Sequence, residues 1–137
     1  MTPSAQIPHL TAPHLTLEAF SAALGNRDAE QAAACFCRDA RLITADRTTV
    51  SGRAEIAPVL AQLIDAQAEF DFSLATLHTA GEVALLRGRC PMRSKGPDLF
   101  WLTQTSDLTV VLQAIEGDWK LAIFAPWEGN LDTEVEG

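Results

Sequence analysis

The sequence predicts an α+β fold in which three N-terminal helices pack on a strongly curved antiparallel sheet. Two observations support this class. Apolar residues recur at helical spacing within residues 16–36 and 51–67, and they alternate with a period of two in a short segment from Ala40 and over most of residues 69–127. Helices followed by a run of strands are typical of a sheet that carries its helices on one face. A chain of 137 residues, 47% of them hydrophobic, is long enough to form one core.

The first two helices are indicated by their capping signals. Thr16 is a suitable N-cap, and Gly25-Asn26 is a suitable stop. Asp28 with Gln31 three positions later forms a capping-box pattern that predicts a second helix after a tight turn. The buried stripe of the first helix is expected to be Leu17, Phe20, Ala23 and Leu24.

The period changes to two at Ala40, where "ARLITAD" predicts a strand and "RTTVSG" a short hairpin partner. The segment "SGRAEIAPVLAQLIDAQ" then predicts the third helix. Pro58 falls near its first turn, where a missing N–H does least harm. Its buried side is expected to be Ile56, Leu60, Leu63 and Ile64.

The remainder predicts a meander of strands. The segments are "EFDFSLATLH", "EVALLRGRC", "LFWLTQTSDLTVVLQAI" and "WKLAIFAPW", with glycine-containing turns before the second and the last. We therefore expect a flexible arm over residues 1–14, a single domain over residues 15–127 and an acidic tail over residues 128–137.

Charge and cysteine usage exclude several classes of function. A net charge of -8 repels nucleic acid and anionic membranes, and no apolar run reaches the length of a membrane span. Three cysteines without a secretion signal predict reduced thiols and a cytoplasmic location. Cys35 and Cys37 point apart if both are helical, and they have no second Cys/His pair. We expect no metal, no cofactor and no disulfide.

The order and spacing of four segments resemble the nuclear transport factor 2-like superfamily, in particular its SnoaL-like and ketosteroid isomerase-like members. The segments are "AFSAALGNRDAEQAAACFCRDARL", "GRAEI", "GEVALLRGR" and "GDWKLAIFAPW", which together span residues 19–127. The resemblance implies a cone-shaped, cystatin-like α+β fold with a deep pocket at its open end. It also implies a homodimer.

The resemblance further implies a carboxylate base on the first strand and two pocket donors, a tyrosine and a protonated aspartate. Those positions fall here on Thr44, Phe20 and near Val110, and the chain contains no tyrosine. The protein is therefore not expected to be a standard ketosteroid isomerase.

Strand alternation identifies other residues that could line such a pocket. Asp46 is the only carboxylate aimed at the mouth, either as a general base with a raised pKa or as an aspartate that stabilises a turn. Arg87 and Arg89 are expected to face outwards, and His78 either tops the pocket or ends a strand. The expected pocket residues are Phe20, Leu24, Leu42, Thr44, Leu60, Gln104, Ser106, Val110 and Trp127.

Two functions are compatible with these residues. The first is a cofactor-independent isomerase, cyclase or dehydratase that acts on a neutral, apolar, ring-containing molecule by acid–base chemistry. The second is a non-catalytic dimeric module that binds an apolar ligand or another protein. In both cases a homodimer is expected through the outer sheet face, where Trp101, Thr109 and Val111 would lie.

Overall fold

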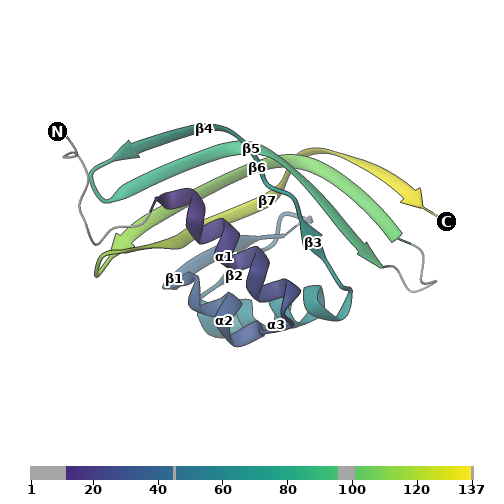
Figure 1. Cartoon of the computed structure of the whole chain (residues 1–137), viewed down its shortest axis with the longest axis horizontal. Helices are drawn as coiled ribbons and strands as arrows, with labels where there is room; N and C mark the ends of the chain where they lie inside the picture. The colour runs from purple at the N-terminus through teal and green to yellow at the C-terminus, as the bar shows by residue number, and fades with distance from the viewer. Residues whose placement is uncertain (1–11, 45, 96–100, 137) are drawn as a thin grey trace.

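The computed structural model describes residues 12–44, 46–95 and 101–136, with side chains in the last range described for residues 103–127. In these residues the helices are α1 (Pro13–Gly25), α2 (Ala29–Ala34) and α3 (Arg53–Asp65). The strands are β1 (Phe36–Ile43), β2 (Thr49–Ser51), β3 (Glu69–Phe70), β4 (Ser73–Ala80), β5 (Val83–Lys95), β6 (Trp101–Ile115) and β7 (Asp118–Glu136). The sheet arches over the helices (Figure 1), which confirms the predicted α+β architecture.

The strand order is β2-β1-β7-β6-β5-β3, and β4 also pairs with β5. Neighbouring strands are antiparallel except β1 and β7, which run parallel with Leu42 opposite Phe124. The sheet is therefore mixed rather than fully antiparallel as expected. A parallel pair needs a long crossover, and the whole segment from β2 to β6 supplies it. None of the described helices is long and apolar enough to cross a membrane.

Helix α1 begins earlier than expected. Pro13 occupies its first turn, so residues 13 and 14 belong to the helix rather than to the predicted arm, whose residues 1–11 lie outside the described part. Thr16 is thus inside the helix and is not its N-cap. Its buried hydroxyl instead donates a hydrogen bond to the carbonyl oxygen of Trp119 at 2.8 Å. The predicted apolar stripe is confirmed, since Leu17, Phe20, Ala23 and Leu24 are all buried.

The caps of the other helices agree better with the sequence. The backbone N–H of Gln31 donates to Asp28 Oδ1 at 3.0 Å, which confirms the predicted cap of α2. Helix α3 starts after Gly52, which has a φ of +86° that favours glycine. Its predicted core residues Ile56, Leu60 and Ile64 are buried, whereas Leu63 is only half-buried.

Two strand boundaries differ from the sequence expectation. The segment expected as one strand with Phe70, Phe72 and Leu74 on one face is broken between β3 and β4. Residues 128–136, expected as an acidic tail, continue β7, and Glu136 lies opposite Trp101 of β6.

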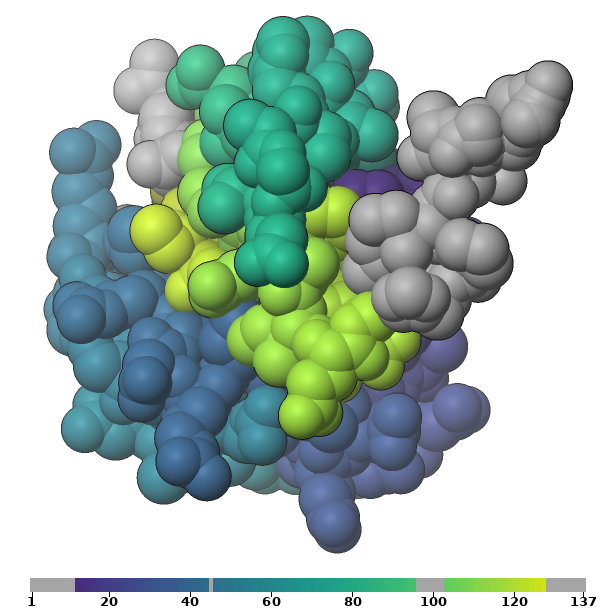
Figure 2. Space-filling model, turned by 90° about the vertical axis from the view of Figure 1, so that its left-hand side faces the viewer, coloured from purple at the N-terminus to yellow at the C-terminus, as the bar shows by residue number. Residues whose placement is uncertain are grey.

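The β4–β5 hairpin and the β6–β7 turn project together at one end of the molecule (Figure 2), and every residue of β4 is exposed.

Candidate ligand-binding site between α1 and β4

The space between the helices and the sheet is filled by aromatic rings. Phe20, Phe36 and Phe124 are fully buried and meet edge to face, with ring centroids 5.7, 5.2 and 5.9 Å apart. Five of the expected pocket residues are part of this hydrophobic core, and none of them lines the cavities described below. They are Phe20, Leu24, Leu42, Leu60 and Val110. At the position of the expected tyrosine donor, a phenyl ring therefore packs against other rings.

Thr44 and Asp46 lie in the exposed turn between β1 and β2. The Asp46 carboxylate accepts hydrogen bonds from the hydroxyl of Thr44 and from the backbone N–H of Thr48, the latter at 3.2 Å. These hydrogen bonds, that from Thr44 above all, stabilise the charged form and lower the pKa of Asp46. The expectation of a base with a raised pKa is wrong, because the group is exposed and well solvated. Asp46 stabilises the turn.

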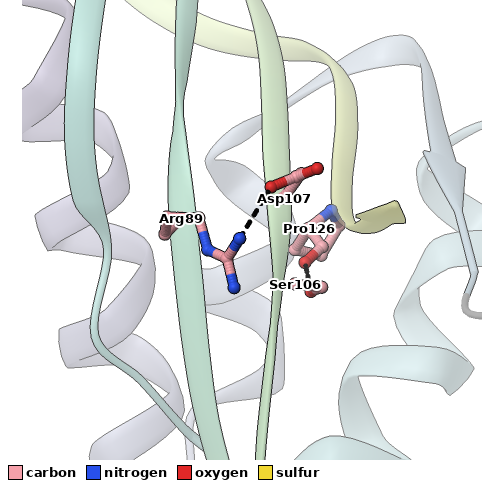
Figure 3. A network of polar contacts seen from close by, with 4 residues as sticks. All are labelled: Arg89, Ser106, Asp107 and Pro126. Carbon is pink, nitrogen blue, oxygen red and sulfur yellow. Dashed lines mark hydrogen bonds and ion pairs between the residues drawn. The ribbon is translucent and has the colours of Figure 1, made fainter. Parts of the chain in front are cut away.

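The expected polar groups of β6 have different roles. Ser106 is fully buried, and its hydroxyl donates to the carbonyl oxygen of Pro126 at 2.5 Å (Figure 3). The β6–β7 register shifts on both sides of Asp107, which pairs with Glu128. Pro126, which has no N–H for the ladder, lies in the second of these shifts, between the partners of Asp107 and Thr109. Ser106 thus satisfies the backbone of an irregular strand. Gln104 is half-buried, and the half-buried Trp127 has its ring 6.1 Å from that of Phe70.

The arginines of β5 face outwards as expected. Arg87 and Arg89 are exposed on the outer sheet face, and Arg89 Nη1 lies 3.2 Å from Asp107 Oδ1 of the neighbouring strand (Figure 3). His78 is an exposed residue of β4 and lies opposite Leu85 of β5. It borders a polar hollow of about 720 Å³ on this outer face together with both arginines, so it does not top an inner pocket.

A different cavity, of about 590 Å³, lies between α1 and the chain that leads from β3 into β4. We call it the α1–β4 cavity. Its wall consists of His14, Leu17, Glu18 and Ser21 from α1 and Phe70, Asp71, Phe72 and Leu74 from the facing segment. The four α1 residues share one helix face because they are spaced by three or four positions. The volume falls within the range usual for small-molecule sites.

The apolar part of the α1–β4 cavity is built around two stacked rings. Phe70 and Phe72 have centroids 5.4 Å apart and planes only 4° from parallel. Phe70 also lies 6.0 Å from Phe20, so the cavity wall is continuous with the core. Of the two leucines in the wall, Leu17 is buried and Leu74 is 39% exposed. A flat apolar ring could pack against such a wall.

The polar part of the cavity contains two carboxylates. Glu18 Oε2 lies 3.8 Å from His14 Nε2, and the backbone N–H of Asp71 donates to the carbonyl oxygen of Pro91 at 2.9 Å. Ser21 Oγ is buried and has no hydrogen-bond partner among the described residues. None of the lining residues that the structure describes is a lysine or an arginine. The α1 spacing could have indicated this site, but nothing in the sequence brings Asp71 to it.

The charge of Asp71 also reaches the core beside the cavity. Cys90, on the inner side of β5, is buried, and this burial is the main cause that raises its pKa to about 12. The negative charge of Asp71 adds to the effect. All three thiols, those of Cys35, Cys37 and Cys90, are free and buried.

A larger groove of about 870 Å³ runs between α2 and α3. Most of its wall is alanine, with Glu30, Arg38 and Arg53 as the charged members. Arg53 is already hydrogen-bonded to the carbonyl oxygen of Phe36. None of its described lining residues is aromatic or has a buried side-chain polar atom without a partner, so the α1–β4 cavity is the better candidate despite its smaller volume.

The fold is similar to several solved structures of low sequence identity. A proposed calcium/calmodulin-dependent protein kinase II association domain from Xanthomonas campestris has a TM-score of 0.74 and 14% identity, covering 82% of this chain and 81% of that one. A proposed aromatic ring hydroxylase from Novosphingobium aromaticivorans has a TM-score of 0.72 and 16% identity, covering 88% and 90%. A proposed dehydratase of the NTF2-like family from Streptomyces avermitilis has a TM-score of 0.68 and 20% identity, covering 82% and 90%. These likenesses show the fold.

A search of curated proteins finds no match to this chain. A family model does match it, over residues 17–120, and that model describes the SnoaL-like domain. The match runs from Leu17, inside α1, to the start of β7, and it includes the described lining residues of the α1–β4 cavity except His14. The chain therefore belongs to the SnoaL-like domain family.

Proposed function

We propose that this protein binds a small, apolar, ring-containing molecule in the α1–β4 cavity and acts on it by cofactor-independent acid–base chemistry. The observation that carries the proposal is the composition of the cavity wall. The stacked rings of Phe70 and Phe72 stand opposite an α1 face that bears Glu18 and Ser21. An apolar body with a few polar groups is the usual composition of a small-molecule site.

The names of structural neighbours support the same class of ligand. They include a proposed aromatic ring hydroxylase, a proposed dehydratase and a proposed scytalone dehydratase, the last from Novosphingobium aromaticivorans. For this chain, the general base is proposed to be Asp71 or Glu18 rather than Asp46. Such a carboxylate would remove a proton next to a carbonyl, and His14 or Ser21 would donate a hydrogen bond to the oxygen that gains charge.

A second candidate is a binding module without turnover. The exposure of Glu18 and Asp71 favours it, because carboxylates that abstract protons from carbon are usually made more basic by burial. The two candidates share the cavity and differ in whether a bound ligand changes. Analysis of a bound ring-containing ketone by NMR in deuterated water separates them: exchange of its α-protons, lost in Asp71→Asn or Glu18→Gln while binding remains, indicates the enzyme.

The binding proposal is tested by a matched pair of leucines on β4. Leu74 lines the cavity and is 39% exposed, whereas Leu77 does not line it and is 46% exposed. We expect Leu74→Gln to weaken the binding of 2-phenylethanol, measured by calorimetry, and Leu77→Gln to leave it unchanged. Equal affinities of the two variants would contradict the proposed location.

We further propose that two copies of the chain associate through the outer sheet face. Ile123, Val83 and Ile115 are exposed there by 38%, 46% and 38%. They lie on the same face as the half-buried Thr109 and Val111; the side chain of Trp101, also expected there, lies outside the described side chains. Light scattering should give a dimeric mass for the wild type and a monomeric mass for Ile123→Glu. A monomeric wild type at micromolar concentration would contradict the proposal.

A further inference from the structure

We propose that the ligand of the α1–β4 cavity carries a primary ammonium group beside its apolar ring. This inference rests on the proposed function of that cavity and specifies the class of ligand. It departs from the neutral ligand expected from the sequence, because the expected inner pocket had no charged wall and this cavity has one.

The fixed charges around the cavity favour a cation. Glu18 and Asp71 are the two carboxylates among the described lining residues, and none of those residues is a lysine or an arginine that could neutralise them. Among the described residues that line the cavity, His14 is the only basic one, and its Nε2 lies 3.8 Å from Glu18 Oε2 on the same helix face. The chain as a whole has a net charge of -8, so its field also attracts cations and repels anions.

Ser21 supplies the observation that points to a hydrogen-bonding ligand. Ser21 is one of the residues that line the cavity, and its hydroxyl oxygen is buried and has no partner within the described part of the chain. Buried polar atoms rarely remain without a partner, and a ligand donor would satisfy this one. A primary ammonium has three N–H donors, which matches one hydroxyl oxygen and two carboxylates.

The aromatic wall completes the match. The faces of phenylalanine rings attract an ammonium electrostatically, and Phe70 and Phe72 offer two such rings in one stack. The same rings and Leu74 can hold the apolar body of the ligand. A carboxylate on the ligand would instead face Glu18 and Asp71 without a cationic partner other than His14, at a cost in desolvation and repulsion.

Calorimetry at neutral pH with a set of related probes tests the inference. The probes are 2-phenylethylammonium, the neutral 2-phenylethanol, 3-phenylpropionate, and trimethyl(2-phenylethyl)ammonium, which keeps the charge but has no N–H. We expect the primary ammonium to bind at least about tenfold more tightly than the alcohol, the effect of one hydrogen bond to a charged group. We expect the quaternary ammonium to bind between the two and the carboxylate to bind most weakly.

Variants locate the effect. Glu18→Gln and Asp71→Asn should each weaken the primary ammonium about tenfold, again the size of one charged hydrogen bond. Both should leave the affinity for the alcohol nearly unchanged. Glu30→Gln and Asp65→Asn remove one exposed carboxylate each outside the cavity and should change neither affinity. Melting curves of all four variants confirm that they are folded.

The outcomes separate this inference from the proposed function. If the alcohol and the primary ammonium bind equally well, the ammonium inference is wrong while a ring-binding cavity stands. The ammonium inference is also wrong if the protein prefers the ammonium but neither Glu18→Gln nor Asp71→Asn reduces that preference. The preference would then arise outside the cavity. If no ring probe binds the wild type, the proposed function fails together with the inference.

Discussion

The hydroxyl of Thr16 donates a 2.8 Å hydrogen bond to the carbonyl oxygen of Trp119, across 103 positions of the chain. The contact joins α1 to the beginning of strand β7 in a buried environment. It therefore fixes the half of α1 that bears His14, Leu17 and Glu18, three residues of the cavity wall.

Thr16→Val keeps the shape of the side chain and removes the donor. We expect the free energy of unfolding to fall by about 1–3 kcal/mol, because the buried carbonyl of Trp119 loses its partner. Urea denaturation measures the loss. Thr76→Val on the exposed strand β4 is the control and should change the stability by less than about 0.5 kcal/mol. Equal effects of both variants would mean that the long-range hydrogen bond contributes nothing.

Gly88 should not tolerate a side chain. A Cβ at this position of β5 would lie 2.1 Å from the carbonyl oxygen of Ser73 and 2.9 Å from the Cα of Leu74. Gly88→Ala must displace the irregular start of β4, and we expect a loss of about 1–3 kcal/mol in stability. Because Leu74 lines the cavity, binding of a ring probe should weaken too.

Gly25→Ala is the matched control for Gly88→Ala. A Cβ at Gly25 meets no atom within 4 Å, and this residue ends α1 in helical conformation. Alanine should therefore be neutral or stabilise the helix by up to about 1 kcal/mol. A Gly88→Ala protein as stable as this control would show that β4 does not approach β5 as closely as described.

Asp46→Asn should have no effect on ligand binding, since the turn lies outside the cavity.

The hydrogen bonds that the Asp46 carboxylate accepts lower its pKa below the ordinary 3.8, so the charged form is favoured in the folded state. The resulting stability is present above pH 3.8 and is lost as the pH falls through the folded value. Titration of the carboxyl carbon by NMR checks the direction; a midpoint above 3.8 would restore Asp46 as a candidate base.

Cys90 gives a prediction at the alkaline end. Its pKa is raised from 9.0 to about 12, chiefly by burial, so folding favours the protonated thiol. The stability that this adds is complete below pH 9 and is lost as the pH rises from 9 towards 12, by at most about 1.4 kcal/mol per pH unit. Urea denaturation should be measured between pH 7 and about 10.5, because lysines begin to lose their charge near that pH. Over this range the free energy of unfolding should decline more steeply for the wild type than for Cys90→Ala. If the stability of the two proteins declined equally with pH, the raised pKa of Cys90 would be contradicted.

The sequence predicted the cap of α2 and the buried faces of helices and strands, because these depend on residues close together in the chain. The Asp28 cap and the stripe through Leu17 and Phe20 follow from spacing alone, and the structure agrees. The alternation of β6 likewise placed Ser106 and Val110 inside. What the spacing could not show is which buried positions border open space, because that depends on how far neighbouring rings fill it.

The candidate site was therefore less predictable than the fold. Phe20 and Val110 face inwards as expected, yet they are covered by core side chains. Asp71 reaches the cavity only because the chain leaves β3 after Phe70, and alternation predicts one unbroken strand there. The hydrogen bond from Thr16 to Trp119 could not be predicted either, because Trp119 lies 103 positions later in the chain.

We propose above that a ring-containing small molecule binds between α1 and β4. An NMR titration of the ¹⁵N-labelled wild type with 2-phenylethylammonium tests it most directly, because each backbone amide reports its own surroundings. We expect the largest shifts at cavity residues on both sides, such as Ser21, Phe72 and Leu74, and almost none at Ala33 and Ala57 in the α2–α3 groove. Shifts concentrated in that groove or around Arg87 on the outer face, or no shifts at millimolar ligand, would contradict it.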